Sequence, residues 1–434
     1  MKKYVIIPGC SDLNRGDQAL VWETKRLAED AGFLGEYYLT SEKNEPVNQS
    51  KERGIKIITP IIEHPSRMFK SKENISYTKV LKIKWGLVAF FDLINSLLLL
   101  VKPFRKIMKK TIDRNKATTI SIMEDADAVF MKGGGLLQTY GGLSSTYSMY
   151  FWVYPILFAH SLKKPVYIMP NSFGPFEGPF VKTIARAALK NCAILTSRET
   201  YSQKMVEKQL GLKVDNYPDL AFALPKSEMN ISKLYEQYSL PHDRELVAIT
   251  MRPYRFPGTQ NPKKAYDTFK KEMALFIDWL YERGFMPVVI EHTLAVNAHE
   301  NDGACIKDVL GMVDKKKYRF VTDKNFNCQD LKTIYSVCDY IVGTRFHSVI
   351  FSFGSNVPGI AIAYTGNKAQ GIMHDIGLDE YIVNIEDVNC DRLIEKFSML
   401  EKNREAVIEK IKKYRADADE KRKCLINACR RVER

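Results

Sequence analysis

An arginine and a histidine stand two residues apart, Arg345 and His347, between apolar stretches that end at Gly343 and resume at Val349. A guanidinium group binds carboxylates and phosphates through paired hydrogen bonds, and an imidazole exchanges protons near neutral pH. The pattern predicts the end of a strand followed by the first turn of a helix, where open α/β sheets bind ligands and helix N-termini favour anions. We therefore predict an anion site with an acid–base group; a surface pair is the alternative.

Three consecutive glycines, Gly133, Gly134 and Gly135, follow the apolar stretch DAVFM and Lys132. Glycine lets backbone N–H groups approach a ligand without a side chain in the way. The spacing matches neither the dinucleotide fingerprint nor the P-loop, so no nucleotide motif is indicated. We predict a loop that contacts a phosphate or a sugar hydroxyl, with a tight structural turn as the alternative.

Two more polar loops are expected after strands. Asn14 and Asp17 belong to the first, which precedes a stretch with helical spacing, and Asn171 and Ser172 belong to the second, in PVYIMPNSFGPF. Amide and hydroxyl groups suit sugar hydroxyls or phosphates, and Asp17 is a candidate base. Because aspartate is also a preferred N-cap residue, a purely structural role for Asp17 is the alternative.

The elements that would position these loops alternate between strand and helix along the chain. Such alternation predicts an α/β fold with parallel sheets, and 434 residues suit two domains. We predict two domains, each with a doubly wound parallel sheet, a cleft between them and C-terminal helices. The expected boundaries are 1–225 for the first domain, with a basic and apolar insertion at about 48–116, 240–389 for the second domain, and 390–434 for the helices.

The net charge is +14, which favours nucleic acid, an acidic membrane surface or phosphorylated small molecules as partners. The basic residues are spread along the chain and no nucleic-acid-binding motif is present, so we expect no nucleic-acid partner. The N-terminal stretch MKKYVIIPGC is too short in its apolar part for a signal peptide. A cytoplasmic location is the resulting expectation.

Residues 85–101 (WGLVAFFDLINSLLLLV) form the most apolar segment. Seventeen residues are the short limit for a membrane span, and Asp92 near the centre would cost roughly 2.5 to 3.5 kcal/mol on insertion scales. Basic residues flank the segment: Lys79, Lys82, Lys84, Lys102, Arg105, Lys106, Lys109 and Lys110. We predict a helix that contacts an anionic membrane surface from the cytoplasmic side without crossing it, with a helix buried in the protein core as the alternative.

Taken in order, several short motifs resemble the polysaccharide pyruvyltransferase family. They are NRGDQAL, KGGGLLQ, PNSFGPF, SRE, PDLAF and RFHSVIFSFGSNVPGIAIAYTGNK. The resemblance covers residues 14–378 or so. The chain departs from the usual Gly-Gln-Ser-Ile-Gly-Pro-Phe at Pro170-Asn171-Ser172-Phe173 and from the usual Arg-Leu-His at Phe346.

The resemblance implies two Rossmann-like domains in a GT-B-like arrangement, with 240–389 as the donor-binding domain. It also implies phosphoenolpyruvate as donor, a hexose of a surface polysaccharide or its lipid-linked precursor as acceptor, and a pyruvate ketal as product. It places Arg345 and His347 at the donor. The reaction needs an acid, a base and several cations, so Arg252 and Lys368 are further donor-binding candidates, His347 the acid and Asp17 the base. No metal and no cofactor are expected.

Two other functions stay open at this point. A GT-B glycosyltransferase that uses a nucleotide sugar would have the same architecture, and a non-catalytic member would bind envelope glycan. The acceptor sugar, the ketal positions, the stereochemistry and the oligomeric state do not follow from the sequence.

Overall fold

The computed structural model describes most of the chain, in the ranges 1–41, 45–65, 79–142, 144–294, 301–364, 366 and 368–433, without the side chains of Lys79, Lys82 and Glu433. Residues 66–78 of the expected insertion, and Thr365 and Asn367 of the last motif, lie outside the described residues. The chain divides into two compact units. Unit 1 comprises Met1–Cys10, Thr24–Asn216 and Ile426–Arg434, and unit 2 comprises Ser11–Glu23 and Tyr217–Leu425.

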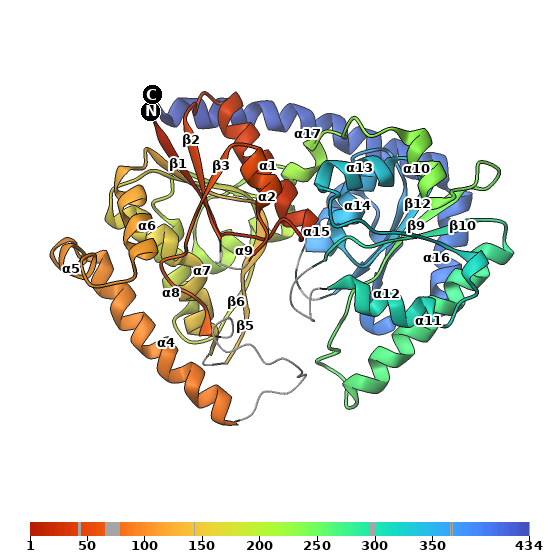
Figure 1. Ribbon diagram of the computed structural model, residues 1–434, viewed down its shortest axis with the longest axis horizontal. Helices are drawn as coiled ribbons and strands as arrows, with labels where there is room; N and C mark the ends of the chain where they lie inside the picture. Colours follow the sequence, from red (N-terminus) through yellow and green to blue (C-terminus); the bar gives the residue numbers. More distant parts are fainter. Residues whose placement is uncertain are drawn as a thin grey trace. The chain divides into compact units, whose positions relative to one another are not determined.

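Unit 1 is built on a sheet with the strand order β3-β2-β1-β4-β6-β7-β8, in which every described pair is parallel; β5 pairs with β6 beside this path. The strands are β1 (Lys3–Ile7), β2 (Glu36–Thr40), β3 (Ile55–Ile58), β4 (Ala128–Met131), β5 (Gly134–Tyr140), β6 (Val166–Glu177), β7 (Ile194–Ser197) and β8 (Asp215–Asn216). The helices between them are α2 (Asn48–Glu52), α4 (Lys79–Leu100), α5 (Lys102–Met108), α6 (Arg114–Asp125), α7 (Ser144–Ser161), α8 (Val181–Leu189) and α9 (Thr200–Leu210) (Figure 1).

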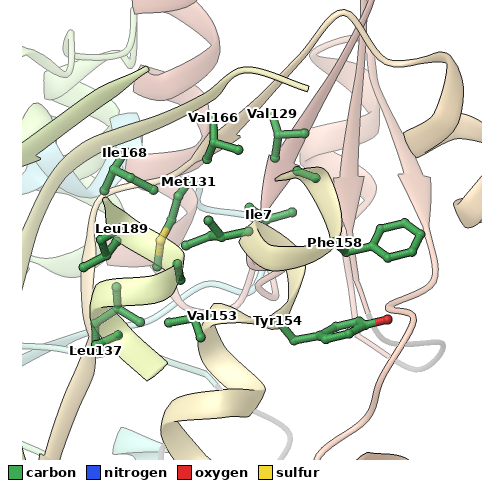
Figure 2. Close-up of a cluster of buried hydrophobic side chains, with 14 of the residues drawn as sticks. Ile7, Val129, Met131, Leu137, Val153, Tyr154, Phe158, Val166, Ile168 and Leu189 are labelled. Atoms are coloured by element: carbon green, nitrogen blue, oxygen red, sulfur yellow. The ribbon is translucent and has the colours of Figure 1, made fainter. Parts of the chain in front are cut away.

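The core of unit 1 lies between this sheet and its helices. Strands of a parallel sheet are covered on both faces, which explains the unbroken apolar runs in β1 and β4. Figure 2 shows side chains from four strands packed with side chains from α7 and α8, among them Ile7, Val129, Met131, Leu137, Val153, Tyr154, Phe158, Val166, Ile168 and Leu189. These side chains are almost fully buried, so the positions of the strand ends are fixed by the packing behind them.

Unit 2 has a second parallel sheet with the order β11-β10-β9-β12-β13-β14. Its strands are β9 (Leu246–Thr250), β10 (Met286–Ile290), β11 (Arg319–Val321), β12 (Tyr340–Gly343), β13 (Gly359–Ala363) and β14 (Ile382–Asn384). Its helices include α10 (Ile231–Tyr238), α11 (Pro262–Glu282), α12 (Asp302–Leu310), α13 (Cys328–Ser336), α14 (Phe346–Phe353), α15 (Lys368–Ile376) and α16 (Cys390–Lys402). Two parallel sheets with helices between their strands confirm the predicted pair of Rossmann-like folds.

Two helices each have residues in both units. α1 (Arg15–Asp30) begins in unit 2 and continues in unit 1, and the C-terminal helix α17 (Arg404–Glu433) begins in unit 2 and ends in unit 1. The sequence analysis assigned the loop with Asn14 to the first domain, whereas the structure groups Ser11–Glu23 with unit 2. The reason is hydrogen bonding, because Leu294 donates its backbone N–H to Leu13 O at 3.0 Å.

Three local expectations were wrong. Asn171 and Ser172 lie inside the long strand β6 rather than in a loop after it, because β5 pairs with this part of β6 and keeps the backbone extended. For the same reason Gly134 and Gly135 open β5, so only Gly133 precedes the strand. Within the expected insertion, Ile55–Ile58 is not an interruption but a strand of the sheet, paired with β2.

Candidate active site

The turn between β12 and α14 carries Arg345, the N-cap residue of α14. This turn is tight because Gly343 leaves room for the helix: a β-carbon there would lie 2.8 Å from Ser348 Oγ and 3.2 Å from Thr250 Oγ1. The two hydroxyls are themselves 2.9 Å apart, and Ser348 Oγ donates to Arg345 O at 2.6 Å. The end of β9, the end of β12 and the first turn of α14 are thereby joined at one point.

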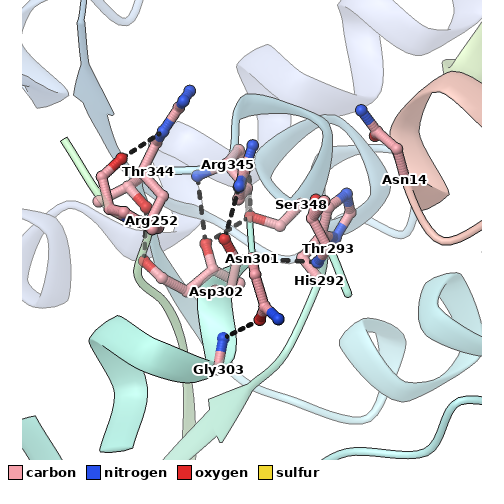
Figure 3. Close-up of polar contacts among 12 residues, drawn as sticks. Asn14, Arg252, His292, Thr293, Asn301, Asp302, Gly303, Thr344, Arg345 and Ser348 are labelled. Atoms are coloured by element: carbon pink, nitrogen blue, oxygen red, sulfur yellow. Dashed lines mark hydrogen bonds and ion pairs between the residues drawn. The ribbon is translucent and has the colours of Figure 1, made fainter. Parts of the chain in front are cut away.

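Arg345 is almost completely buried, and its guanidinium binds the carboxylate of Asp302 (Figure 3). Nε and Nη2 lie 2.8 Å and 2.7 Å from Oδ1. Asp302 Oδ2 accepts the backbone N–H of Thr293 at 2.9 Å. Burial raises the pKa of Asp302, and the Arg345 charge opposes that shift. One edge of the guanidinium is thus held by a fully buried carboxyl, which fixes the orientation of the arginine.

His347 lies in the same turn, among groups of opposite charge. Lys368 Nζ lies 3.2 Å from both ring nitrogens, and Asp219 Oδ2 lies 3.9 Å from Nε2. The imidazole is 12% exposed, whereas the Asp219 side chain is fully buried and also accepts the Ala221 N–H at 2.9 Å. The ring therefore has an ammonium and a carboxylate as neighbours and retains access to solvent, as an acid–base group requires.

The backbone of Gly16 also packs against His347. A β-carbon on Gly16 would overlap Nδ1 and Cγ of the imidazole, so the ring lies directly against the glycine backbone. Both residues belong to unit 2. The sequence motifs around Gly16 and His347, which are far apart along the chain, are thus parts of one site.

The residues on either side of Gly16 hold the loop onto unit 2. Asn14 forms an antiparallel bridge with Thr293. Arg15 is buried; it donates from Nη2 to Lys324 O at 2.8 Å and from Nη1 to Asp12 O, and burial lowers its pKa. Gln18 Oε1 accepts the backbone N–H of Cys328, the first residue of α13, at 2.8 Å.

Asp17 and Asn14 bind each other at the start of α1. Asn14 Nδ2 donates to Asp17 Oδ2 at 2.8 Å, and the Asp17 backbone N–H donates to Asn14 Oδ1 at 3.3 Å. The second of these bonds is an N-cap contact, which stabilises a helix N-terminus, and the first links the two side chains. Asp17 is half-buried in the loop that contacts His347, so the structural role is present and a role as base stays a prediction.

Arg252 and His292 are two further polar residues of this site. Arg252 follows β9, donates to Pro253 O at 3.2 Å and lies over the Tyr364 ring, 4.2 Å from its centroid. His292 is buried, with Nδ1 3.0 Å from Tyr335 OH. Burial lowers the pKa of His292 well below its usual range, and the charges of Arg345, Lys368 and Arg15 add to the effect. His292 is therefore a neutral ring beside three cations.

Unit 1 holds a second cluster, around Gly134 and Gly135. Lys132 and Arg198 are both 1% exposed. A β-carbon on Gly134 would lie 3.6 Å from Asn171 Oδ1 and 4.0 Å from Lys132 Nζ, and one on Gly135 would lie 3.1 Å from Arg198 Nη2. The glycine backbones thus lie close to two buried cations, and buried charges of this kind are costly and typical of binding sites.

Polar partners fix this cluster. Arg198 Nε donates to Ser172 Oγ at 2.8 Å, and Asn171 Nδ2 donates to Lys132 O at 3.0 Å. Within the described residues, Asn171 Oδ1 is buried without a hydrogen-bond partner. Glu199 accepts from Ser202, and burial raises the pKa of Glu199 to about 7. The cluster offers positive charge and one buried acceptor, as a phosphorylated sugar would need.

The predicted residues therefore form two groups. Arg345, His347, Lys368, Arg252, Asn14 and Asp17 lie in unit 2, and Gly133, Gly134, Gly135, Asn171 and Ser172 lie in unit 1. Sequence reasoning missed Asp302, Asp219, Gly16, His292, Arg198 and Glu199 as site residues. Four of these stood in motifs already noted, namely Gly16 in NRGDQAL, Asp219 in PDLAF, and Arg198 and Glu199 in SRE; nothing local singled out Asp302.

A family model for polysaccharide pyruvyl transferase matches residues 14–366. This range contains the site from Asn14 to Arg345 and His347 and spans most of the chain. The chain belongs to the polysaccharide pyruvyl transferase family.

One curated relative and several solved structures are similar to this chain. Amylovoran biosynthesis protein AmsJ from Erwinia amylovora is 27% identical over 303 residues, which are 67% of this chain and 69% of AmsJ. UDP-GlcNAc 2-epimerase from Neisseria meningitidis has a similar structure, with a TM-score of 0.54, 12% identity and 99% of each chain covered. HepE from Anabaena, solved with UDP and glucose, has a TM-score of 0.54 and 11% identity over 98% of this chain and 97% of HepE. These two likenesses concern the fold alone, which is that of GT-B glycosyltransferases and epimerases.

Proposed function

We propose that the protein transfers pyruvyl from phosphoenolpyruvate to a hexose of a surface polysaccharide or of its lipid-linked precursor, forming a pyruvate ketal and releasing phosphate. The family match supports the transfer of pyruvyl to a polysaccharide. The choice of phosphoenolpyruvate as donor depends mainly on one observation. Gly16 and Lys368 both lie against His347 in unit 2, next to the turn with Arg345.

The donor requires several positive charges. Phosphoenolpyruvate carries a carboxylate and a phosphate on one small skeleton, and guanidinium and ammonium groups bind both. Arg345 is oriented by Asp302, Arg252 lies against Tyr364, and Lys368 lies beside His347. In this proposal these three cations hold the donor at the N-terminus of α14, where backbone N–H groups add to the attraction.

The proposed chemistry begins with a proton. His347 gives a proton to the methylene carbon of phosphoenolpyruvate, which becomes a methyl group and leaves an oxocarbenium carbon. One sugar hydroxyl attacks this carbon and loses its proton to a base, for which Asp17 is the candidate. The bond between that carbon and the phosphate oxygen then breaks, and phosphate leaves with the bonding electron pair. A second hydroxyl attacks the same carbon and closes the ketal, and its proton passes to the departing phosphate. One donor and two hydroxyls thereby give one ketal and one phosphate.

The cluster of unit 1 is proposed to bind the acceptor. Lys132 and Arg198 supply positive charge for a phosphate of a lipid-linked sugar, and Asn171 Oδ1 supplies an acceptor for a hydroxyl. A buried acceptor without a partner costs free energy, on the order of 1–3 kcal/mol, until a donor reaches it. Sugar hydroxyls are donors of this kind.

Product analysis tests the proposal. The purified protein is incubated with phosphoenolpyruvate, a panel of nucleotide sugars and candidate lipid-linked oligosaccharides, and products are identified by mass spectrometry. We expect an acceptor that gains a pyruvate ketal, with nucleotide sugars unchanged. Turnover of a nucleotide sugar with phosphoenolpyruvate intact would instead establish a glycosyltransferase. Binding of glycan without turnover of either donor would establish a non-catalytic protein.

A further inference from the structure

The helices α4 and α5 expose an apolar face that has no counterpart elsewhere in the described residues. Ten of the 18 exposed large hydrophobic side chains lie between Val80 and Ile107. They are Val80, Ile83, Leu87, Phe90, Phe91, Ile94, Leu97, Val101, Phe104 and Ile107, and we refer to them as the α4–α5 face. Phe91 is 61% exposed and Ile107 is 64% exposed. The alternative of a helix buried in the protein core is therefore wrong for this side of the segment.

Along α4 these residues recur every three or four positions, so they lie along one side of that helix. The backbone is extended at Val101, and Phe104 and Ile107 add exposed apolar side chains in α5. Ile83–Leu100 has a mean hydropathy of 1.7, and 11% of it is buried. Soluble monomers rarely expose a patch of this kind unless it binds something.

The opposite side of α4 is attached to unit 1. Ser96 Oγ lies 2.8 Å from Tyr150 OH, and Tyr154 OH donates to Ser96 O at 3.2 Å. Leu99 belongs to the hydrophobic core. In Figure 1, α4 runs along the margin of unit 1 beside α7. The helix is thus fixed by α7, and the α4–α5 face points away from these contacts.

Charge distinguishes the partners that this face could bind. Asp92 is the only acidic residue between Lys79 and Ile112. Its carboxyl accepts from Tyr147 OH at 3.0 Å, on the α7 side, and burial raises the pKa of Asp92. Lys84, Lys102, Lys106 and Lys110 are exposed around the face. Among the described side chains from Val80 to Ile112, the face is therefore apolar with a positive border and no exposed acidic group, which complements an anionic surface.

The sequence suggested that all the flanking basic residues contribute to this border, but two of them do not. Arg105 is buried and forms an ion pair with Glu124 at 3.3 Å, and Lys109 pairs with the same carboxylate at 2.6 Å. The side chains of Lys79 and Lys82 lie outside the described residues.

We propose that the α4–α5 face binds the surface of an anionic phospholipid bilayer, with both helices parallel to the surface and the apolar side chains among the lipid headgroups. A bilayer fits better than a second copy of the chain, because both ends of the face are basic and two copies would repel each other in either orientation. A span fits less well, because it would separate Ser96 and Asp92 from their partners on α7. With the expected cytoplasmic location, this surface is the inner leaflet of the cell membrane.

Vesicle flotation tests the proposal without reference to the enzyme reaction. Deletion of the segment would remove Leu99 from the core, so point substitutions on the exposed side are preferable. We expect the protein to float with vesicles of phosphatidylcholine and phosphatidylglycerol, to float much less with phosphatidylcholine alone, and to dissociate in alkaline carbonate. The triple variant Leu87→Ser, Phe90→Ser, Phe91→Ser should lose binding by at least tenfold. A matched variant in unit 2, Ile231→Ser with Leu275→Ser, should bind as the unchanged protein does, and circular dichroism confirms that both fold.

The outcomes separate the alternatives. A second triple variant, Lys102→Glu, Lys106→Glu, Lys110→Glu, should lose the preference for anionic lipid. Equal flotation of the apolar variant and the unchanged protein would overturn the proposal, as would retention in carbonate, which indicates a span. A dimer in sedimentation that the apolar variant abolishes, without any flotation, would assign the face to a second copy instead.

Discussion

The imidazole of His347 lies against the backbone of Gly16, and a side chain at Gly16 would occupy the same space as the ring. This relationship joins two motifs from distant parts of the sequence in one site. The residues on either side of Gly16 hold the loop in place, because Asn14, Arg15 and Gln18 all bind unit 2. The loop therefore belongs to unit 2 together with His347.

Gly16→Ala tests this relationship. The added methyl group must displace His347, and a displacement of about 1 Å in an active site costs up to roughly a hundredfold in rate. We expect kcat to fall by about tenfold to a hundredfold while the protein stays folded. Gly258→Ala is the control, because a β-carbon there has no neighbour within 4 Å in the described residues. Equal activity of both variants would show that the position of His347 is not critical.

His347→Asn should remove most turnover and leave phosphoenolpyruvate binding largely intact. The imidazole is proposed to transfer a proton, which contributes about a hundredfold or more to catalysis, whereas the charge of the donor is bound by Arg345, Arg252 and Lys368. Equilibrium dialysis with labelled phosphoenolpyruvate measures binding and phosphate release measures turnover. Because Lys368 Nζ lies 3.2 Å from the ring, it is the next candidate for the acid. Turnover by the His347 variant like that of the unchanged protein would move the role to Lys368.

Arg345→Ala should weaken donor binding, slow turnover and destabilise unit 2. The substitution leaves Asp302 buried without its guanidinium, and breaking a buried ion pair in this way costs about 3–5 kcal/mol. Urea unfolding and the apparent KM for phosphoenolpyruvate are the measurements. Adding Asp302→Asn should restore part of the stability but not the KM. Recovery of the KM in the double variant would mean that Arg345 only neutralises Asp302.

Glu199 should make stability depend on pH. Its pKa is raised from 4.5 to about 7 by burial, so the folded protein keeps this proton over a range in which the unfolded chain loses it. The unfolded state then binds fewer protons, and the free energy of unfolding falls as pH rises from about 4.5 to about 7, by on the order of 3 kcal/mol at most.

Glu199→Gln should flatten this decline, as measured by urea unfolding at several pH values. The control is Glu207→Gln, at an exposed position of α9, the helix for which Glu199 is the N-cap residue. This substitution should leave the decline in stability unchanged. Identical pH profiles for the unchanged protein and the Glu199 variant would show that this carboxyl is ionised in the folded state.

The sequence predicted the fold because its signals are repeated and local. Apolar runs such as those of β1 and β4 alternate with helical spacing, and parallel sheets follow from this alternation. The turn with Arg345 and His347 was predictable for the same reason, since its strand and helix are both encoded nearby. The extended course of β6 through Asn171 was not, because pairing with β5 decides it.

Local sequence patterns could not predict which residues contact Arg345 and His347. Asp302 binds Arg345 and Asp219 lies near His347, yet each stands far from its partner in the sequence, and nothing around Asp302 differs from an ordinary helix start. The grouping of Asn14 with unit 2 depends on hydrogen bonds to Thr293 and its neighbour, which no periodicity encodes. The motifs identified most of the segments that contribute residues to the candidate site. Which of these segments contact one another is decided by tertiary packing.

The fate of one oxygen atom tests the central claim most directly. Phosphoenolpyruvate carrying a heavy oxygen isotope in the bridge between carbon and phosphorus is supplied with a glycan acceptor, and the released phosphate is analysed by mass spectrometry. Ketal formation breaks the bond between carbon and the bridging oxygen, so we expect the label in phosphate, and only when acceptor is present. Phosphate without the label, or label release that does not depend on acceptor, would contradict the proposed transfer of pyruvyl to a sugar.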